Sequence, residues 1–147
     1  MMVMSQQDDS DATKTCPLTQ IYARCMYGPM LIFKIFRRPE WNELRDAGET
    51  AGAPIDLADG YVHFSTAAQV AETAAKYFAD QSDLVLVAVE ADTLGAALRW
   101  EASRGGALFP HLYRHLRLAD VAWDKALPLG ATGHIFPESH MFPGAKP

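Results

Sequence analysis

The chain has 147 residues, of which 49% are hydrophobic and 21% are charged, as in one ordinary globular domain. Its formal net charge of −5 excludes the broad basic face that general nucleic-acid binders need. The most apolar run, residues 84–89, is far shorter than the roughly 18 residues of a membrane-spanning helix. We therefore expect one core and no membrane segment. The polar, acidic N-terminal residues lack the apolar region of a signal peptide, which predicts a cytoplasmic location.

The two ends of the chain differ in composition from the rest. Residues 1–29 hold both cysteines and most of the methionines but no periodic apolar pattern, which predicts a disordered tail. Met30 stands directly before the first predicted strand and is a candidate translation start, in which case the tail is a mis-called extension. Residues 30–138 are predicted to form the domain, and residues 139–147 to form a frayed end.

The order of apolar and turn residues predicts an α+β domain. Strands are expected over residues 31–36, 61–65 and 84–89, the last at the centre of the sheet because it is continuously apolar. A helix is expected between Pro39 and Gly48, and another over residues 67–78 with Thr66 as its cap.

Residues 56–60 are expected to form a turn, and shorter pieces follow over residues 98–101, 109–113 and 121–127, the last a strand. Because helices do not alternate with strands throughout, we expect an α+β arrangement with two main helices rather than a doubly wound sheet.

Histidines are the first candidate functional residues. His63 and Ser65 share one face of their predicted strand with Tyr61, so their polar groups point the same way. His111 lies two positions before Tyr113. The alternative interpretation is a histidine bonded to a backbone carbonyl inside the core, because functional histidines are the minority.

Charged residues beside an aromatic ring form the second candidate group. Arg99 and Glu101 share a face of the predicted strand over residues 98–101, and Trp100 points the opposite way. The two charges are expected to line a polar pocket that Trp100 separates from the core, because burying either charge without a partner is costly. A solvated edge strand is the alternative.

Metal and nucleophile chemistry are weaker candidates. His111 and His115 share a face only if their segment is helical, and Pro110 suits an extended segment as well, so no metal site is predicted. Ser65 lacks the Gly-x-Ser-x-Gly turn that exposes a nucleophilic serine. The sequence also lacks a Walker loop and a Gly-x-Gly-x-x-Gly turn.

Several motifs together resemble the bacterial family called domain of unknown function 952. They are Ile-Phe-Lys-Ile at residues 32–35, Trp41, Asp-Gly-Tyr-Val-His-Phe-Ser-Thr at 59–66, Leu-Val-Leu-Val-Ala-Val at 84–89, Arg-Trp-Glu at 99–101, Phe-Pro-His-Leu-Tyr at 109–113 and Phe-Pro at 136–137. The resemblance covers residues 31–138. The family is defined by sequence and not by an established activity.

This family is in turn similar to the ADP-ribosyltransferase-like superfamily, and RNA 2′-phosphotransferases share its order of His-x-Ser, helix and Leu-Val-Leu-x-Val strand. The resemblance implies an ADP-ribosyltransferase-like split sheet, mixed or antiparallel, whose cleft takes NAD as a substrate. It puts Lys34 where many relatives have His or Arg on the first strand, and His63 at the second-strand position. Ser65 and Thr66 match the adjoining polar pair.

The same resemblance implies a role for each candidate residue. Glu101, with His63, is the implied catalytic residue, because a carboxylate stabilises the positive charge that develops on ribose as nicotinamide leaves. Tyr113 would stack on a planar ring, and Arg99 with His111 would meet a phosphate. The implied ligand-binding residues are Lys34, Ser65, Thr66, Arg99, His111 and Tyr113.

Two functions of different classes remain open from the sequence. The first is a transferase directed at NAD or a nucleotide phosphate, with a small nucleotide as ligand. The second is a non-catalytic domain that binds a small molecule or a partner through the same polar cleft. The sequence identifies neither an acceptor nor an oligomeric state.

Overall fold

The computed structural model describes residues 30–137. The predicted tail over residues 1–29 and the predicted frayed end over residues 139–147 lie outside the described residues. The helices are α3 (Arg38–Ala47), α4 (Pro54–Asp59) and α5 (Val70–Tyr77), with 3-10 segments η2 (Ala91–Ala97), η3 (Arg104–Gly106) and η4 (Leu118–Asp120). The strands are β1 (Leu31–Arg37), β2 (Glu49–Thr50), β3 (Val62–His63), β4 (Ser65–Thr66), β5 (Leu84–Glu90), β6 (Leu98–Ser103), β7 (Ala107–Leu112), β8 (Leu116–Arg117), β9 (Val121–Leu127), β10 (Leu129–Gly130) and β11 (Gly133–His134).

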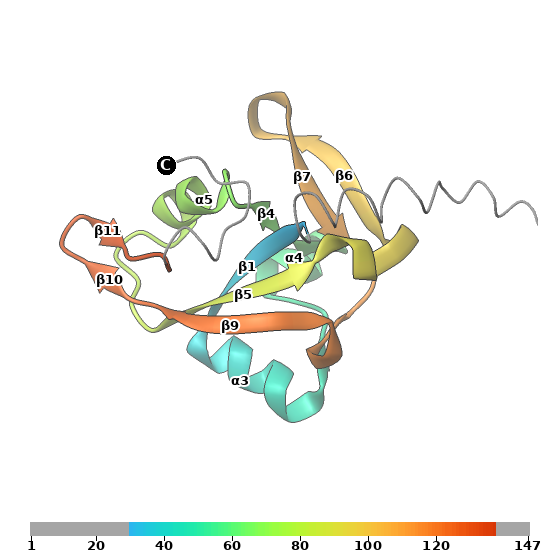
Figure 1. Cartoon of the computed structure of the whole chain (residues 1–147), viewed down its shortest axis with the longest axis horizontal. Helices are drawn as coiled ribbons and strands as arrows, with labels where there is room; N and C mark the ends of the chain where they lie inside the picture. Colours follow the sequence, from blue (N-terminus) through green and yellow to red (C-terminus); the bar gives the residue numbers. More distant parts are fainter. Residues whose placement is uncertain (1–29, 138–147) are drawn as a thin grey trace, which may run out of the picture.

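A four-stranded antiparallel sheet in the order β4-β1-β5-β9 forms the centre of the domain (Figure 1). All residues of β5 except the last are buried, which confirms the prediction that this apolar run is central. Apolar residues can alternate to both faces of such a strand without meeting water, because other elements cover both faces.

A second, three-stranded antiparallel sheet has the order β3-β7-β6. Its β6–β7 hairpin projects from the domain on the side opposite α3 (Figure 1). Two-stranded pairs, β2-β8 and β10-β11, complete the described pairing. The prediction of an α+β domain with antiparallel strands is therefore confirmed, and residues 30–137 contain no parallel pair.

The predicted strand over residues 61–65 is divided between the two sheets. His63 pairs with His111 of β7, whereas Ser65 pairs with Phe33 of β1. Between them, the Phe64 amide donates a hydrogen bond to the Pro110 carbonyl. The expectation that His63 and Ser65 share one face is wrong, because regular alternation holds only while a strand stays in one sheet.

Helix α3 begins and ends close to its predicted residues, whereas α4 and α5 differ from the prediction. The carboxylate of Glu40 accepts a hydrogen bond from the Arg37 amide at the start of α3, and Gly48, with φ of 85°, ends the helix. Helix α4 spans residues 54–59 and so includes most of the segment 56–60, for which the sequence predicts a turn. Helix α5 begins at Val70, three residues later than predicted, and Thr66 does not cap it: its carbonyl accepts the Gln69 amide in a turn that precedes the helix.

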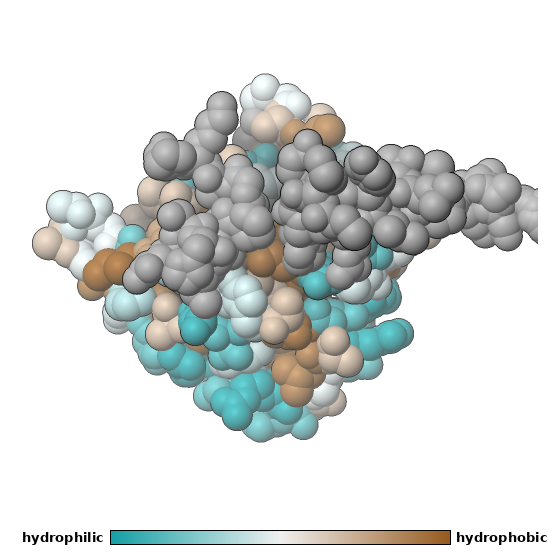
Figure 2. Space-filling view, in the orientation of Figure 1, coloured by the Kyte–Doolittle hydropathy of each residue, from teal (hydrophilic) through white to brown (hydrophobic). Residues whose placement is uncertain are grey.

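Two groups of buried residues lie on opposite faces of the four-stranded sheet. One joins the sheet to α3 and the second sheet and includes Phe36, Trp41, Val62 and Leu112; the other includes Phe33, Ile35, Val70, Ala74 and Leu86 and lies against α5. Hydrophilic residues cover the outer surface of α3 in Figure 2. None of the helices between residues 30 and 137 has the length and hydrophobicity that crossing a membrane requires.

Candidate functional site

The carboxylate of Asp56, on α4, is a buried hydrogen-bonding centre. Its Oδ2 lies 2.7 Å from Lys34 Nζ and accepts the Ala53 amide at 2.7 Å. Its Oδ1 lies 2.6 Å from His63 Nδ1 and accepts the His63 amide at 3.0 Å. The Lys34 ammonium also donates to the His63 carbonyl at 3.2 Å. Strand β1, helix α4 and strand β3 thus meet at a single side chain.

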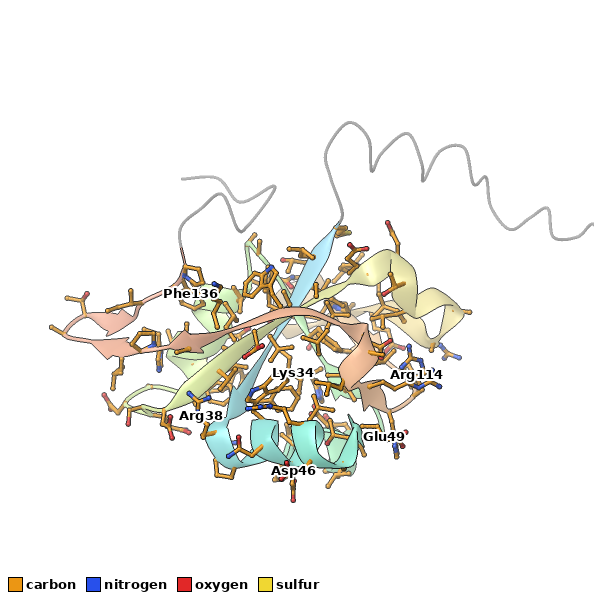
Figure 3. All side chains as sticks on the ribbon, turned by 60° about the horizontal axis from the view of Figure 1, so that its bottom comes forward. Lys34, Arg38, Asp46, Glu49, Arg114 and Phe136 are labelled. Carbon is orange, nitrogen blue, oxygen red and sulfur yellow. The ribbon has the colours of Figure 1, made fainter. Side chains whose placement is uncertain are left out.

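Burial of these charges is compensated by their mutual contacts. Burial by itself raises the pKa of Asp56, but the His63 hydrogen bond and the Lys34 charge outweigh it and lower the pKa below its usual value. Only 6% of the Lys34 side chain and none of the Asp56 side chain is exposed. Figure 3 shows Lys34 in the middle of the molecule. Lys34 is therefore a structural partner of Asp56, and its ammonium is not open to solvent.

The second ring nitrogen of His63 has its own carboxylate partner. His63 Nε2 lies 3.0 Å from Oδ2 of Asp59, at the last residue of α4. The Asp59 side chain is 39% exposed, and that of His63 is 32% exposed. The imidazole therefore has a buried carboxylate on one side and a partly exposed carboxylate on the other.

Glu101 and His111 form a second group on the neighbouring strands β6 and β7. One oxygen of Glu101, Oε1, accepts hydrogen bonds from His111 Nδ1 and from the Tyr113 hydroxyl, each at 2.8 Å. These bonds, His111 first, lower the pKa of Glu101, and the bond to Glu101 raises the pKa of Tyr113. The carboxyl group is therefore held ionised on a surface where 37% of its side chain is exposed.

Four rings join the two groups, and we call them the histidine–tyrosine cluster: Tyr61, His63, Tyr113 and the buried His111. The Tyr61 ring stacks on His111 with centroids 4.2 Å apart, and it lies 4.8 Å from His63 and 5.1 Å from Tyr113. The two imidazoles meet edge to face at 5.2 Å. Burial and then the charges of Asp59 and Glu101 raise the pKa of Tyr61.

The side chains of Arg99 and Trp100 lie in different places. The Arg99 guanidinium lies over the Tyr113 ring, 4.6 Å from its centroid, and so borders the histidine–tyrosine cluster. Trp100 was expected to back the pocket from the core, but it is 37% exposed. It lines a separate depression of about 220 Å³ with Met30, Ala91 and Leu98 among its neighbours.

The fold brings most of the predicted site residues together. His63, His111, Tyr113, Glu101 and Arg99 lie on or beside the histidine–tyrosine cluster, and Lys34 reaches it from inside the protein through Asp56.

Ser65 and Thr66 are placed elsewhere. Ser65 is buried, and its Oγ lies 2.9 Å from Thr73 Oγ1 of α5. The Thr66 amide donates to the Gln69 side chain at 3.0 Å. Both residues therefore belong to the packing of α5 and β1, because the chain enters the other sheet after His63.

Three residues of the site were not predicted: Asp56, Asp59 and Tyr61. Tyr61 shares the alternation of His63 and was within reach of that pattern. Asp56 had an indirect signal, because Lys34 interrupts an otherwise apolar strand and a buried ammonium needs a carboxylate partner. Which of the chain's carboxylates fills that place depends on the tertiary structure.

The described residues show no metal-binding geometry. Between residues 30 and 137, no group of three or more histidine, cysteine, aspartate or glutamate side chains is arranged to hold a metal ion. His115 does not pair with His111: its Nδ1 lies 2.7 Å from Oε2 of Glu49 at an exposed position.

Comparisons with known proteins agree on one family. Residues 35–124 match the family described as "Protein of unknown function (DUF952)". The crystal structure of protein CC0527 from Caulobacter crescentus is similar, with 50% sequence identity and a TM-score of 0.69 over 76% of this chain and 96% of that chain. Its solution NMR structure gives 52% identity and a TM-score of 0.65 over 71% of this chain and 90% of that chain. No curated protein matches the sequence. The chain belongs to the DUF952 family.

Proposed function

We propose that this protein is a transferase that acts on NAD, or on a related nucleotide phosphate, at the histidine–tyrosine cluster. Two independent features support the proposal. The sequence motifs resemble those of the ADP-ribosyltransferase-like superfamily, and a partly exposed, ionised carboxylate lies beside aromatic rings and a guanidinium.

The bonding of Glu101 is the observation that carries this proposal. Both of its described donors, His111 Nδ1 and the Tyr113 hydroxyl, bind the same oxygen, Oε1. They lower the pKa of the carboxyl group, so it is a poor proton acceptor but a stable negative charge. Such a charge suits a reaction whose transition state gains positive charge on a sugar.

In the proposed reaction the bond between the nicotinamide nitrogen and ribose C1′ breaks, and its electron pair leaves with nicotinamide. The Glu101 carboxylate stabilises the oxocarbenium-like ribose. An acceptor oxygen, from water or another molecule, then bonds to C1′ and loses its proton to solvent. His63 Nε2, which lies 3.0 Å from the partly exposed Asp59 carboxylate, is suited to hydrogen-bond a ribose hydroxyl in exchange for that contact, and Arg99 is suited to meet the diphosphate.

Nicotinamide release from NAD tests the proposal. We expect release by the wild-type protein and a loss of about 100-fold or more in Glu101→Gln, which keeps the size of the side chain but removes its charge. Glu72→Gln is the matched control, because Glu72 lies on α5 with 69% of its side chain exposed. Circular dichroism must show that all three proteins are folded.

Two results would count against the transferase. A wild-type protein that neither binds NAD in calorimetry nor releases nicotinamide removes its support. Binding of NAD without release of nicotinamide would instead support the second candidate function, a non-catalytic domain that uses the polar face for ligand binding.

A further inference from the structure

We propose that Asp56 is a positioning residue, which holds the His63 ring with Nδ1 as a fixed hydrogen-bond donor and Nε2 toward the exposed side of the histidine–tyrosine cluster. This deepens the proposed function by naming what orients one of its site residues. The kinetic consequence rests on the proposed function, but the ring geometry does not.

The four contacts of Asp56 leave its carboxylate little freedom to move. Two donors, Lys34 Nζ and the Ala53 amide, meet Oδ2, and two donors from His63 meet Oδ1. A carboxylate has about four acceptor positions, so all of them are used. Loss of any one donor would leave part of a buried charge without a partner, which is costly.

The same bonding defines the proton on His63. An ionised carboxylate only accepts hydrogen bonds, and Asp56 stays ionised because its partners lower its pKa. His63 Nδ1, at 2.6 Å from Asp56 Oδ1, must therefore carry a proton. A neutral ring in this arrangement has its lone pair on Nε2, and a charged ring donates from both nitrogens.

The two carboxylates beside His63 differ in their surroundings. The Asp56 side chain is fully buried, whereas 39% of the Asp59 side chain is exposed. Asp59 ends α4 and precedes Gly60, which has φ of 88°. Asp56 is therefore the partner that fixes the ring, and Asp59 is a surface contact at the nitrogen that faces outward.

A close backbone approach further restrains Asp56. Gly52 has φ of 109°, and a Cβ atom at this position would collide with Asp56 Oδ2. The Gly52 amide is itself held by Thr50 Oγ1 at 3.0 Å. The loop before α4 thus packs directly on the carboxylate, and a glycine is required at this close approach.

Orientation of His63 also matters for the rest of the cluster. Its ring meets His111 edge to face at 5.2 Å and lies 4.8 Å from Tyr61. His111 in turn donates to Glu101. A rotation of His63 away from Asp56 would disturb its contacts with both rings, and one of them, His111, is bonded to the proposed catalytic carboxylate.

NMR of the ligand-free protein tests the positioning role directly. We expect a downfield, exchange-protected proton on His63 Nδ1, assigned by its loss in His63→Gln. The signal should persist in Asp59→Asn, the matched control, and disappear in Asp56→Asn. A persistent signal in Asp56→Asn, or its loss in Asp59→Asn, would overturn the assignment of Asp56. If Asp56→Asn does not fold, the ¹⁵N spectrum of wild-type protein decides: a protonated Nδ1 supports the role, and an unprotonated Nδ1 overturns it.

Kinetics separate this inference from the proposed function. In a protein that releases nicotinamide, Asp56→Asn should lower kcat by about 10- to 100-fold with a smaller change in KM, because Asp56 acts through His63 and does not touch the ligand. An unchanged kcat would contradict the positioning role. If wild-type protein releases no nicotinamide, the proposed function fails, while the NMR result still decides the position of the ring.

Discussion

Lys34 Nζ and Asp56 Oδ2 lie 2.7 Å apart in the interior, where neither side chain has appreciable contact with solvent. A buried ion pair of this kind contributes little over a well-packed apolar pair, but removal of one partner leaves an uncompensated charge. The pair also joins the central strand β1 to α4, which carries Asp56. Stability and site geometry therefore depend on the same contact.

Replacement of Lys34 should destabilise the fold strongly. We expect Lys34→Met to lower the free energy of unfolding by about 3–5 kcal/mol, because methionine keeps much of the apolar stem but leaves Asp56 without its cation. Urea unfolding measures the change. Lys76→Met is the control, because Lys76 is 53% exposed, and it should change stability by less than about 0.5 kcal/mol. A loss below about 1 kcal/mol in Lys34→Met would show that His63 and the backbone amides suffice for Asp56.

Acid should weaken the contribution of Asp56 to stability. Burial raises its pKa, but the His63 bond and the Lys34 charge lower it further, so the folded pKa lies below the unfolded value of about 3.9. A group with a lowered folded pKa stabilises the fold fully above the unfolded pKa and loses that effect as pH falls toward the folded pKa. The difference in thermal stability between wild type and Asp56→Asn should therefore be constant above about pH 5 and shrink below about pH 4. A difference that grows in acid would contradict the direction of the shift.

Replacement by alanine should lower stability more at Gly52 than at Gly48, although both glycines have positive φ. Gly48 has φ of 85° and open space at its Cβ position, so Gly48→Ala should cost only the backbone penalty of about 1–2 kcal/mol. Gly52 has φ of 109°, and its added Cβ would also collide with Asp56. We expect Gly52→Ala to cost more than Gly48→Ala in chemical denaturation and to remove the His63 Nδ1 proton signal. Equal costs for the two variants would show that the loop moves aside.

Ser65 should affect stability more than ligand binding. Ser65→Ala removes the bond to Thr73 Oγ1, 2.9 Å away, inside the protein and should cost about 1 kcal/mol. Because Ser65 faces α5 and not the histidine–tyrosine cluster, nicotinamide release should stay within about twofold of wild type. Thr73→Ala should reproduce the stability loss. A folded Ser65→Ala protein that no longer binds NAD would instead support the ligand-binding role that the superfamily resemblance implies.

Local patterns predict the regular elements and several neighbours in the candidate site. Strands β1, β5 and β9 and helix α3 match their apolar periodicity to within a residue or two. Glu101 and His111 come together because β6 and β7 form a hairpin, so their approach needs only short-range pairing.

Long-range pairing explains what the sequence does not predict. Asp56 reaches Lys34 only when the tertiary fold brings α4 close to β1, and no periodicity specifies which carboxylate of the chain fills that place. The exchange of sheets at Phe64 depends on partners in β1 and β7, so alternation around His63 misplaces Ser65. The prediction that Trp100 separates the pocket from the core is wrong for a different reason. Its strand β6 is an edge of its sheet, and the face away from Glu101 meets solvent.

The passage of the chain through Phe64 sets a limit on length variation. One residue separates His63, whose backbone pairs in one sheet, from Ser65, whose backbone pairs in the other. An inserted or deleted residue here would shift one strand by a single step and reverse its buried and exposed faces. Relatives of this fold are therefore expected to differ in length at surface turns such as residues 79–83, while the spacing between β3 and β4 stays constant.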